Sequence, residues 1–246
     1  MSPRRGHGAR SLIFVGDMSD LFHEKRPWPV IDKVFAIMAI ARRHNFQLLT
    51  KRPHIMAEYC LDLETPRRIE AQAGKIKMKH ISDDFGFPGE VVWPLPNVWK
   101  GTSVERQQEA DARLPHLLRC PARFRFLSCE PLLGPVDLTT MGCMWPPWRI
   151  ESGTYNALGG SWWASVDDPA YEARTAETEL PHVDWVICGG ESGPKRRPMD
   201  LAWARSLRDQ CQSADVSFFM KQIDKVTPIP PDLMIRQFPG HPKDAK

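Results

Sequence analysis

Short apolar runs alternate with amphipathic segments along most of this chain. The clearest unit begins with Val183–Ile187, a largely apolar run that predicts a buried strand. A turn rich in glycine and charge follows it. From Asp200, which is placed to cap a helix, apolar residues recur at helical spacing between Leu201 and Cys211. The pattern predicts a strand, then a polar loop, then a helix.

The same order of elements begins at five other places. Apolar runs predict strands at residues 11–16, 46–50, 97–101, 123–128 and 216–220. Strands that alternate with helices indicate a parallel sheet covered by helices. Six strands are too few for a closed eight-stranded barrel. The sequence therefore predicts an α/β fold, a TIM-like partial (βα) barrel of about six parallel strands.

Four segments depart from this alternation. Residues 1–10, rich in Gly and Arg, are expected to be disordered, and the barrel domain is expected to cover residues 11–222. Residues 65–96 are predicted to be an irregular insertion. Residues 134–182 form a second, Trp-rich insertion without a clear period, which either closes over the site as a lid or packs onto the barrel. The Pro-rich tail at 223–246 is expected to lie along the surface.

Polar side chains follow every predicted strand. Right-handed crossovers bring the carboxyl ends of parallel strands to one edge, and ligands bind α/β sheets there. We therefore expect these side chains to share one mouth. The candidates for a catalytic role are Asp17, Lys51, Glu130 and Glu191. The candidates for ligand binding are Thr50, Arg52, Ser103, Ser128, Gly189, Gly190, Ser192, Lys221 and Gln222.

Two of these carboxylates are expected to work together. Glu130 lies directly after a strand and before a proline, where it is placed to act as a general base or to bind a cation. Glu191 is expected at the next strand end, and two carboxylates at one mouth push their pKa values apart. Asp20 is explained equally by hydrogen bonds within its own turn. Glu105 is explained by a capping box that begins at Thr102.

The glycine-rich turn and the basic run each allow two interpretations. Gly189 and Gly190 either cradle an anion or the amino acid part of a cofactor with their backbone N–H groups, or permit a tight exit from the strand. The spacing matches neither a dinucleotide-binding motif nor a P-loop. Lys195–Arg197 suits a phosphate or carboxylate, but also suits a solvated loop.

Composition narrows the class of protein only slightly. The chain of 246 residues is long enough to bury a core without disulfides or metals, and its net charge of +3 permits nucleic-acid contact without arguing for it. The six cysteines and eight histidines show no metal-like spacing, so no metal site is predicted. No segment is long enough to span a membrane, and the protein is expected to be cytoplasmic.

Several strings, in order, resemble one known family. They are Asp17–His23 (DMSDLFH), Leu49–Pro53 (LTKRP), Asn97–Glu105 (NVWKGTSVE), Ser128–Gly134 (SCEPLLG), Gly189–Pro194 (GGESGP) and Phe219–Gln222 (FMKQ). The chain looks like the phage and prophage gp-thirty-seven/gp-sixty-eight-like family, a domain of unknown function similar to radical S-adenosylmethionine (radical-SAM) partial barrels. The resemblance implies a radical-SAM-like barrel with S-adenosylmethionine as a ligand.

One feature of that family is missing. The resemblance implies an N-terminal CxxxCxxC segment that holds an iron–sulfur cluster, and none of the six cysteines here has that spacing. We therefore expect a truncated or degraded copy without the cluster. The first hypothesis is the larger, C-terminal part of a radical-SAM-like enzyme that binds a small-molecule or nucleotide-like ligand at the strand ends.

The second hypothesis belongs to a different class of protein. In it the chain is a non-catalytic protein that binds nucleic acid or a partner. Its contacts would come from Lys51, Arg52 and Lys195–Arg197, with the Trp-rich insertion as a stacking surface. Whether the protein is an enzyme stays open at this point.

Overall fold

The computed structural model describes residues 11–16, 19–80, 90–143, 153–164 and 180–240. Residues 1–10, for which we expect disorder, lie outside these ranges. The chain divides into two compact units. Unit 1 runs to Lys100 and includes Cys120–Arg123, and unit 2 comprises Gly101–Arg119 and the chain from Phe124 onward.

The strands confirm the predicted fold class. Six of them form one sheet in the order β1 (Leu12–Val15), β2 (Asn45–Thr50), β3 (Val98–Ser103), β4 (Arg125–Cys129), β8 (Trp185–Gly189) and β9 (Ser217–Gln222). The division between the units falls within β3. The pairs β1–β2, β4–β8 and β8–β9 are parallel. The chain is therefore an α/β protein with the six parallel strands expected of a partial (βα) barrel. In the part that the structure describes, no helix combines the length and the apolar character needed to cross a membrane.

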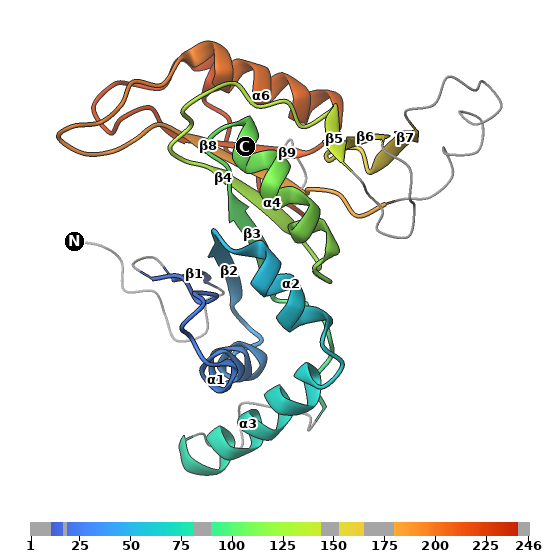
Figure 1. Cartoon of the computed structure of the whole chain (residues 1–246). Helices are drawn as coiled ribbons and strands as arrows, with labels where there is room; N and C mark the ends of the chain where they lie inside the picture. Colours follow the sequence, from blue (N-terminus) through green and yellow to red (C-terminus); the bar gives the residue numbers. More distant parts are fainter. Residues whose placement is uncertain (1–10, 17–18, 81–89, 144–152, 165–179, 241–246) are drawn as a thin grey trace. The chain divides into compact units, whose positions relative to one another are not determined.

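The described part of unit 1 contains strands β1 and β2, the first residues of β3, and the helices α1, α2 and α3 (Figure 1). Its elements are β1 (Leu12–Val15), α1 (Trp28–Ile40), β2 (Asn45–Thr50), α2 (Pro53–Leu61) and α3 (Thr65–His80). Helices α1 and α3 pack together. Asp32 of α1 is buried, accepts a hydrogen bond from the Tyr59 hydroxyl at 2.7 Å and forms an ion pair with Arg68 of α3 at 3.3 Å. These contacts join both α2 and α3 to α1.

The presence of α3 corrects the prediction that residues 65–96 are irregular. The helix buries Thr65, Ile69 and Ala73, which are spaced four residues apart and form one narrow stripe. The Thr65 hydroxyl also donates to the Tyr59 carbonyl at 2.7 Å. Among the described side chains of α3, three small or medium residues mark the stripe, and the surrounding positions carry many charges. The apolar period was therefore too weak to recognise.

Unit 2 holds the other strands of the large sheet. Its elements are α4 (Gln107–Arg119), β4 (Arg125–Cys129), β8 (Trp185–Gly189), α6 (Leu201–Ser213), β9 (Ser217–Gln222) and a 3-10 turn at Pro231–Leu233. The Asp200 side chain caps α6 by accepting from the Ala202 N–H at 2.8 Å, as the sequence predicts. Helix α6 packs on β8 and β9 with its apolar face, which includes Ala204 and Leu207 (Figure 1).

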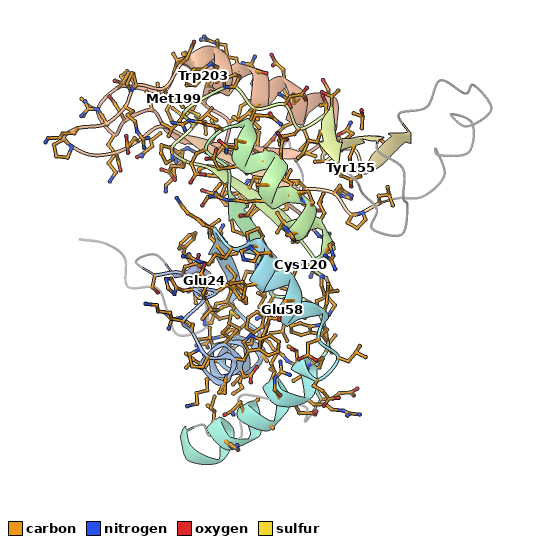
Figure 2. All side chains as sticks on the ribbon, in the orientation of Figure 1. Glu24, Glu58, Cys120, Tyr155, Met199 and Trp203 are labelled. Atoms are coloured by element: carbon orange, nitrogen blue, oxygen red, sulfur yellow. The ribbon has the colours of Figure 1, made fainter. Side chains whose placement is uncertain are left out.

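The second insertion also contains regular structure. Strands β5 (Met141–Cys143), β6 (Gly153–Asn156) and β7 (Ser161–Ala164) form a small antiparallel sheet. The expectation of an irregular segment is therefore wrong for these residues. Tyr155, labelled in Figure 2, is buried and its hydroxyl donates to the Pro181 carbonyl. The described part of the insertion is thus packed within unit 2, while Trp145 and Trp148 lie outside the described residues.

The C-terminal tail covers the outer edge of the sheet. The Met220 N–H donates to the Ile235 carbonyl at 2.8 Å, and the Gln237 N–H donates to the Phe218 carbonyl at 3.0 Å. The ring of Phe238 lies 5.3 Å from that of Trp185. The tail therefore occupies backbone groups that an edge strand would otherwise expose.

Candidate functional site

The polar cluster of unit 1 is centred on Asp20. This residue follows β1, and its Oδ1 accepts from the Phe22 N–H at 2.9 Å and from the Thr50 hydroxyl at 2.7 Å. Its Oδ2 accepts from the Lys51 N–H at 3.1 Å and from Arg52 Nη1 at 3.0 Å. Burial opposes ionisation, but the hydrogen bonds from Thr50, Phe22, Lys51 and Arg52 outweigh it and lower the pKa of Asp20. Asp20 therefore joins the exits of β1 and β2.

The cation in this cluster is shared between two carboxylates. Arg52 Nε donates to Glu24 Oε1 at 2.6 Å, in addition to its contact with Asp20. Glu24 is labelled in Figure 2. The sequence placed Thr50, Lys51 and Arg52 at one site and the structure brings all three to Asp20. The sequence pattern did not indicate Glu24 as a member of this site. Asp17 lies outside the described residues.

The polar cluster of unit 2 is centred on Glu130. This residue follows β4, and Glu130 Oε2 lies 2.7 Å from Lys221 Nζ. Gln222 Nε2 donates to Glu130 Oε1 at 3.1 Å and to the Gly190 carbonyl at 3.2 Å. The side chain of Glu130 is 18% exposed and that of Lys221 is 54% exposed. Three predicted residues therefore meet at the carboxyl ends of β4 and β9, beside the chain that leaves β8.

The structure favours the packing interpretation for Gly190. A Cβ atom on this residue would lie 2.0 Å from the Ile223 carbonyl oxygen, so no larger residue fits. The Gly190 N–H donates to the Gln222 carbonyl at 3.1 Å, and the Gly189 carbonyl accepts from the Leu132 N–H at 2.9 Å. Close approach of the chains explains Gly190 without a ligand.

Glu191 pairs with a cation of its own loop. Arg197 donates to Glu191 through Nε and Nη2 at 3.0 Å each and through its backbone N–H at 2.8 Å. These hydrogen bonds lower the pKa of Glu191 to about 2. Arg196 forms an ion pair with Asp224 at 3.0 Å, a partner that sequence reasoning missed. Glu130 and Glu191 therefore each pair with a different cation, and an interaction between the two carboxylates stays a prediction.

The remaining predicted residues of unit 2 lie on β3, on β4 and in the loop after β8. Ser128 is buried in β4, where its carbonyl accepts from the Val104 N–H at 3.0 Å, and Ser192 lies exposed in the loop after β8. The Ser103 carbonyl accepts from Arg113 Nη1 at 2.8 Å. The same guanidinium contacts Glu105 Oε2 at 2.8 Å.

The predicted capping box at Thr102 is wrong. Thr102 lies within β3 and α4 begins only at Gln107, so Thr102 is not at the start of that helix. The carboxylate of Glu105 instead meets Arg113, one to two turns into α4. The residues from Thr102 to Glu105 have the spacing of a capping box, but Thr102 and Ser103 belong to the strand.

The two clusters belong to different units, so their convergence on one mouth stays a prediction. Unit 2 also contains a hollow of about 330 Å³, whose lining does not include Glu130, Lys221 or Gln222. Its lining includes Phe124, Asp184 and Val216, which are the residues directly before β4, β8 and β9. That hollow therefore lies at the amino ends of the strands and not beside Glu130.

The chain is thus an α/β protein with a large parallel sheet and with polar clusters directly after several of its strands. Among the described side chains, no group of three or more His, Cys, Asp or Glu is arranged to hold a metal ion. The chain belongs to the family described as Protein of unknown function (DUF5131), whose profile matches residues 2–234. No match was found among curated proteins or solved structures. The expected membership of a family of unknown function is confirmed.

Proposed function

We propose that unit 2 binds a small zwitterionic ligand around Glu130, Lys221 and Gln222. The observation that carries this proposal is the 2.7 Å contact between Glu130 and Lys221, which joins a partly buried carboxylate to a half-exposed ammonium. The position agrees with the general location of ligand sites at the carboxyl ends of parallel strands. The cluster offers one negative group, one positive group and one amide within a few ångströms.

An amino acid carries the complementary pair of charges. Its α-ammonium matches Glu130, and its α-carboxylate matches Lys221. Exchange of the existing ion pair for these contacts is favourable because a half-exposed ion pair contributes little stability by itself. Gln222 supplies an amide that orients the Glu130 carboxylate. The arrangement therefore selects a ligand with an amino-acid head group.

S-adenosylmethionine carries such an amino-acid head group and is the ligand that the sequence resemblance suggests. We extend the proposal accordingly to a phage-family, radical-SAM-like scaffold. The described residues do not fit an iron–sulfur cluster, since no three of their Cys, His, Asp or Glu side chains lie together as ligands. The proposal therefore concerns binding of the ligand, and no reaction step passes through a cluster.

Isothermal titration calorimetry with S-adenosylmethionine tests this proposal. Glu130→Gln and Lys221→Met each remove one charge of the pair, and we expect each to weaken binding about 10-fold or more. Arg205→Gln is the matched control, because it breaks the exposed ion pair between Arg205 of α6 and Asp232 of the 3-10 turn and should leave affinity unchanged. Equal affinity in all three variants would disprove the assignment.

A second titration identifies the part of the ligand that is recognised. S-adenosylhomocysteine keeps the amino-acid head group, whereas methylthioadenosine lacks it. We expect binding of the first and no detectable binding of the second. The opposite order would show that the adenosine carries the affinity and that the Glu130 cluster does not.

The alternative, binding of nucleic acid through the basic loops, is less well supported. Arg52 is paired with Asp20 and Glu24, and Arg196 and Arg197 are each paired with a carboxylate. Nucleic acid would have to replace these contacts. Filter binding of single-stranded DNA over a salt series tests it, because phosphate contacts require a steep salt dependence.

A further inference from the structure

A buried lysine in unit 1 lies among groups that the proposed ligand site does not use. Lys100 of β3 is 1% exposed, and its ammonium lies 4.9 Å from the centre of the Trp93 ring. Lys100 Nζ also donates to the Pro121 carbonyl. A buried ammonium is costly unless it is paired, and an aromatic face and one carbonyl compensate it only in part. A nearby anion would complete its environment.

Two thiols lie beside this ammonium. Cys60 is near the end of α2 and Cys120 directly follows α4, and both are buried. Lys100 Nζ contacts the carbonyl of Pro121, the residue directly after Cys120, and the Trp93 ring beneath the ammonium donates through Nε1 to the Cys60 carbonyl at 3.3 Å, so that both cysteines flank the ammonium. Cys120 is labelled in Figure 2. Residues from three separate parts of the chain thus bring two sulfur atoms and one cation together.

The charge of Lys100 changes the chemistry of Cys60. Burial alone would raise the pKa of the Cys60 thiol, but the hydrogen bond with Cys120 and the neighbouring ammonium lower it from 9.0 to about 7. In unit 2, burial raises the pKa of Cys129 and Cys188 instead. These two thiols are register partners on β4 and β8, so closeness of sulfur atoms alone does not produce a thiolate.

We propose that Cys60 and Cys120 form a redox-active dithiol, which hydrogen peroxide converts into an intramolecular disulfide while Lys100 holds Cys60 as the attacking thiolate. The Cys60 sulfur attacks one peroxide oxygen, the O–O bond breaks, and Cys60 becomes a sulfenic acid as hydroxide leaves. The Cys120 sulfur then attacks the Cys60 sulfur. The S–S bond forms, the S–O bond breaks, and the departing hydroxide takes the Cys120 proton as water. Two thiols and one peroxide thus give one disulfide and two waters.

Because both sulfur atoms are buried, the oxidant has to be small. A small neutral peroxide can reach the site through local opening of unit 1, whereas bulky disulfides and alkylating reagents require a larger opening. The disulfide would close the chain between Cys60 and Cys120 and restrict the unfolded ensemble. The oxidised protein should therefore show a higher thermal midpoint than the reduced protein.

The direct test uses the full chain, fully reduced and then treated with hydrogen peroxide. After alkylation and digestion without reductant, mass spectrometry should find the peptide Cys120–Arg123 joined to the peptide that contains Cys60, with two hydrogens lost. The link should form before Cys129, Cys188 or Cys211 is oxidised, and dithiothreitol should reverse it. Its rate should rise with pH through about 7. Oxidation of the unit 2 thiols first, or a rate that does not change with pH, would overturn the proposal.

Variants separate the role of the charge from the presence of the sulfur atoms. Lys100→Met removes the ammonium from a buried position, and we expect the link to form at least about fivefold more slowly at neutral pH. In Cys120→Ala, mass spectrometry should find a single added oxygen on Cys60 and no link, and the oxygen should be added more slowly because the hydrogen bond with Cys120 is gone. Cys188→Ala, in unit 2, is the control and should form the link at the wild-type rate. An unchanged rate in Lys100→Met would show that the cation has no role, and circular dichroism confirms that each variant folds.

Discussion

Asp20 in unit 1 and Glu130 in unit 2 both follow a strand and both contact a cation, yet their other partners differ. Two of the four donors to Asp20 are backbone N–H groups, those of Phe22 and Lys51. Both donors described for Glu130 are side chains, Lys221 and Gln222. The first carboxylate is part of the backbone structure of its turn, whereas the second is held by groups that can rotate away.

This difference teaches how to interpret a polar residue after a strand. A carboxylate that satisfies backbone donors cannot change partners without leaving buried N–H groups without an acceptor, which is costly. A carboxylate bound only by side chains can exchange them for a ligand. Position after a strand therefore does not separate a structural carboxylate from a binding one, and the identity of the donors does.

The largest expected effect is that of Asp20→Ala. The substitution removes the acceptor from two backbone N–H groups, the Thr50 hydroxyl and Arg52, and we expect it to destabilise unit 1 by about 3 kcal/mol. Urea unfolding gives the overall change, and hydrogen exchange at the Phe22 and Lys51 amides reports the local loss. Glu24→Ala is the control, since it removes only the exposed partner of Arg52 and should cause no resolvable change. Similar midpoints for both variants would refute the structural role of Asp20.

Glu130→Gln is expected to have a smaller effect on stability. The substitution keeps the shape of the side chain and one acceptor oxygen, and Lys221 is half exposed and regains water. We expect a loss of about 1 kcal/mol or less in the free energy of unfolding. The same urea experiment measures it. A loss as large as that of Asp20→Ala would mean that Glu130 is also a structural residue and would weaken the proposed ligand site.

The sequence predicted the strands better than the other elements. Buried parallel strands read as continuous apolar runs, and all six in the large sheet lie within a few residues of their predicted positions. Helix α3 was missed because the buried stripe of its described side chains, Thr65, Ile69 and Ala73, contains a single strongly apolar residue. Strands β5, β6 and β7 were missed because three or four residues are too few to show a period.

The composition of the candidate site was also partly predictable. Residue types and strand-end positions identified Glu130, Lys221 and Gln222 as neighbours, although Glu130 and Lys221 are 91 residues apart. The pairing of each carboxylate with its cation was not predictable, because it depends on register. A register shift between β8 and β9 brings Gly189 opposite Gln222, and that shift has no signature in the pattern of side chains.

The smallest expected effect concerns Glu191, which accepts hydrogen bonds from Arg197 of the same exposed loop. Arg197 lowers the pKa of Glu191 to about 2, so the ion pair contributes fully above the ordinary value of 4.5 and is lost as the pH falls through about 2. An NMR titration should therefore show the Arg197 amide and guanidinium signals unchanged down to pH 3 and shifting only below it. In Glu191→Gln these signals should start at their shifted positions and show no such transition, while the thermal midpoint stays that of the wild type. A transition near pH 4.5 in the wild-type protein would mean that Arg197 does not hold Glu191 in solution, and Glu191 would then be available, like Glu130, to meet a ligand.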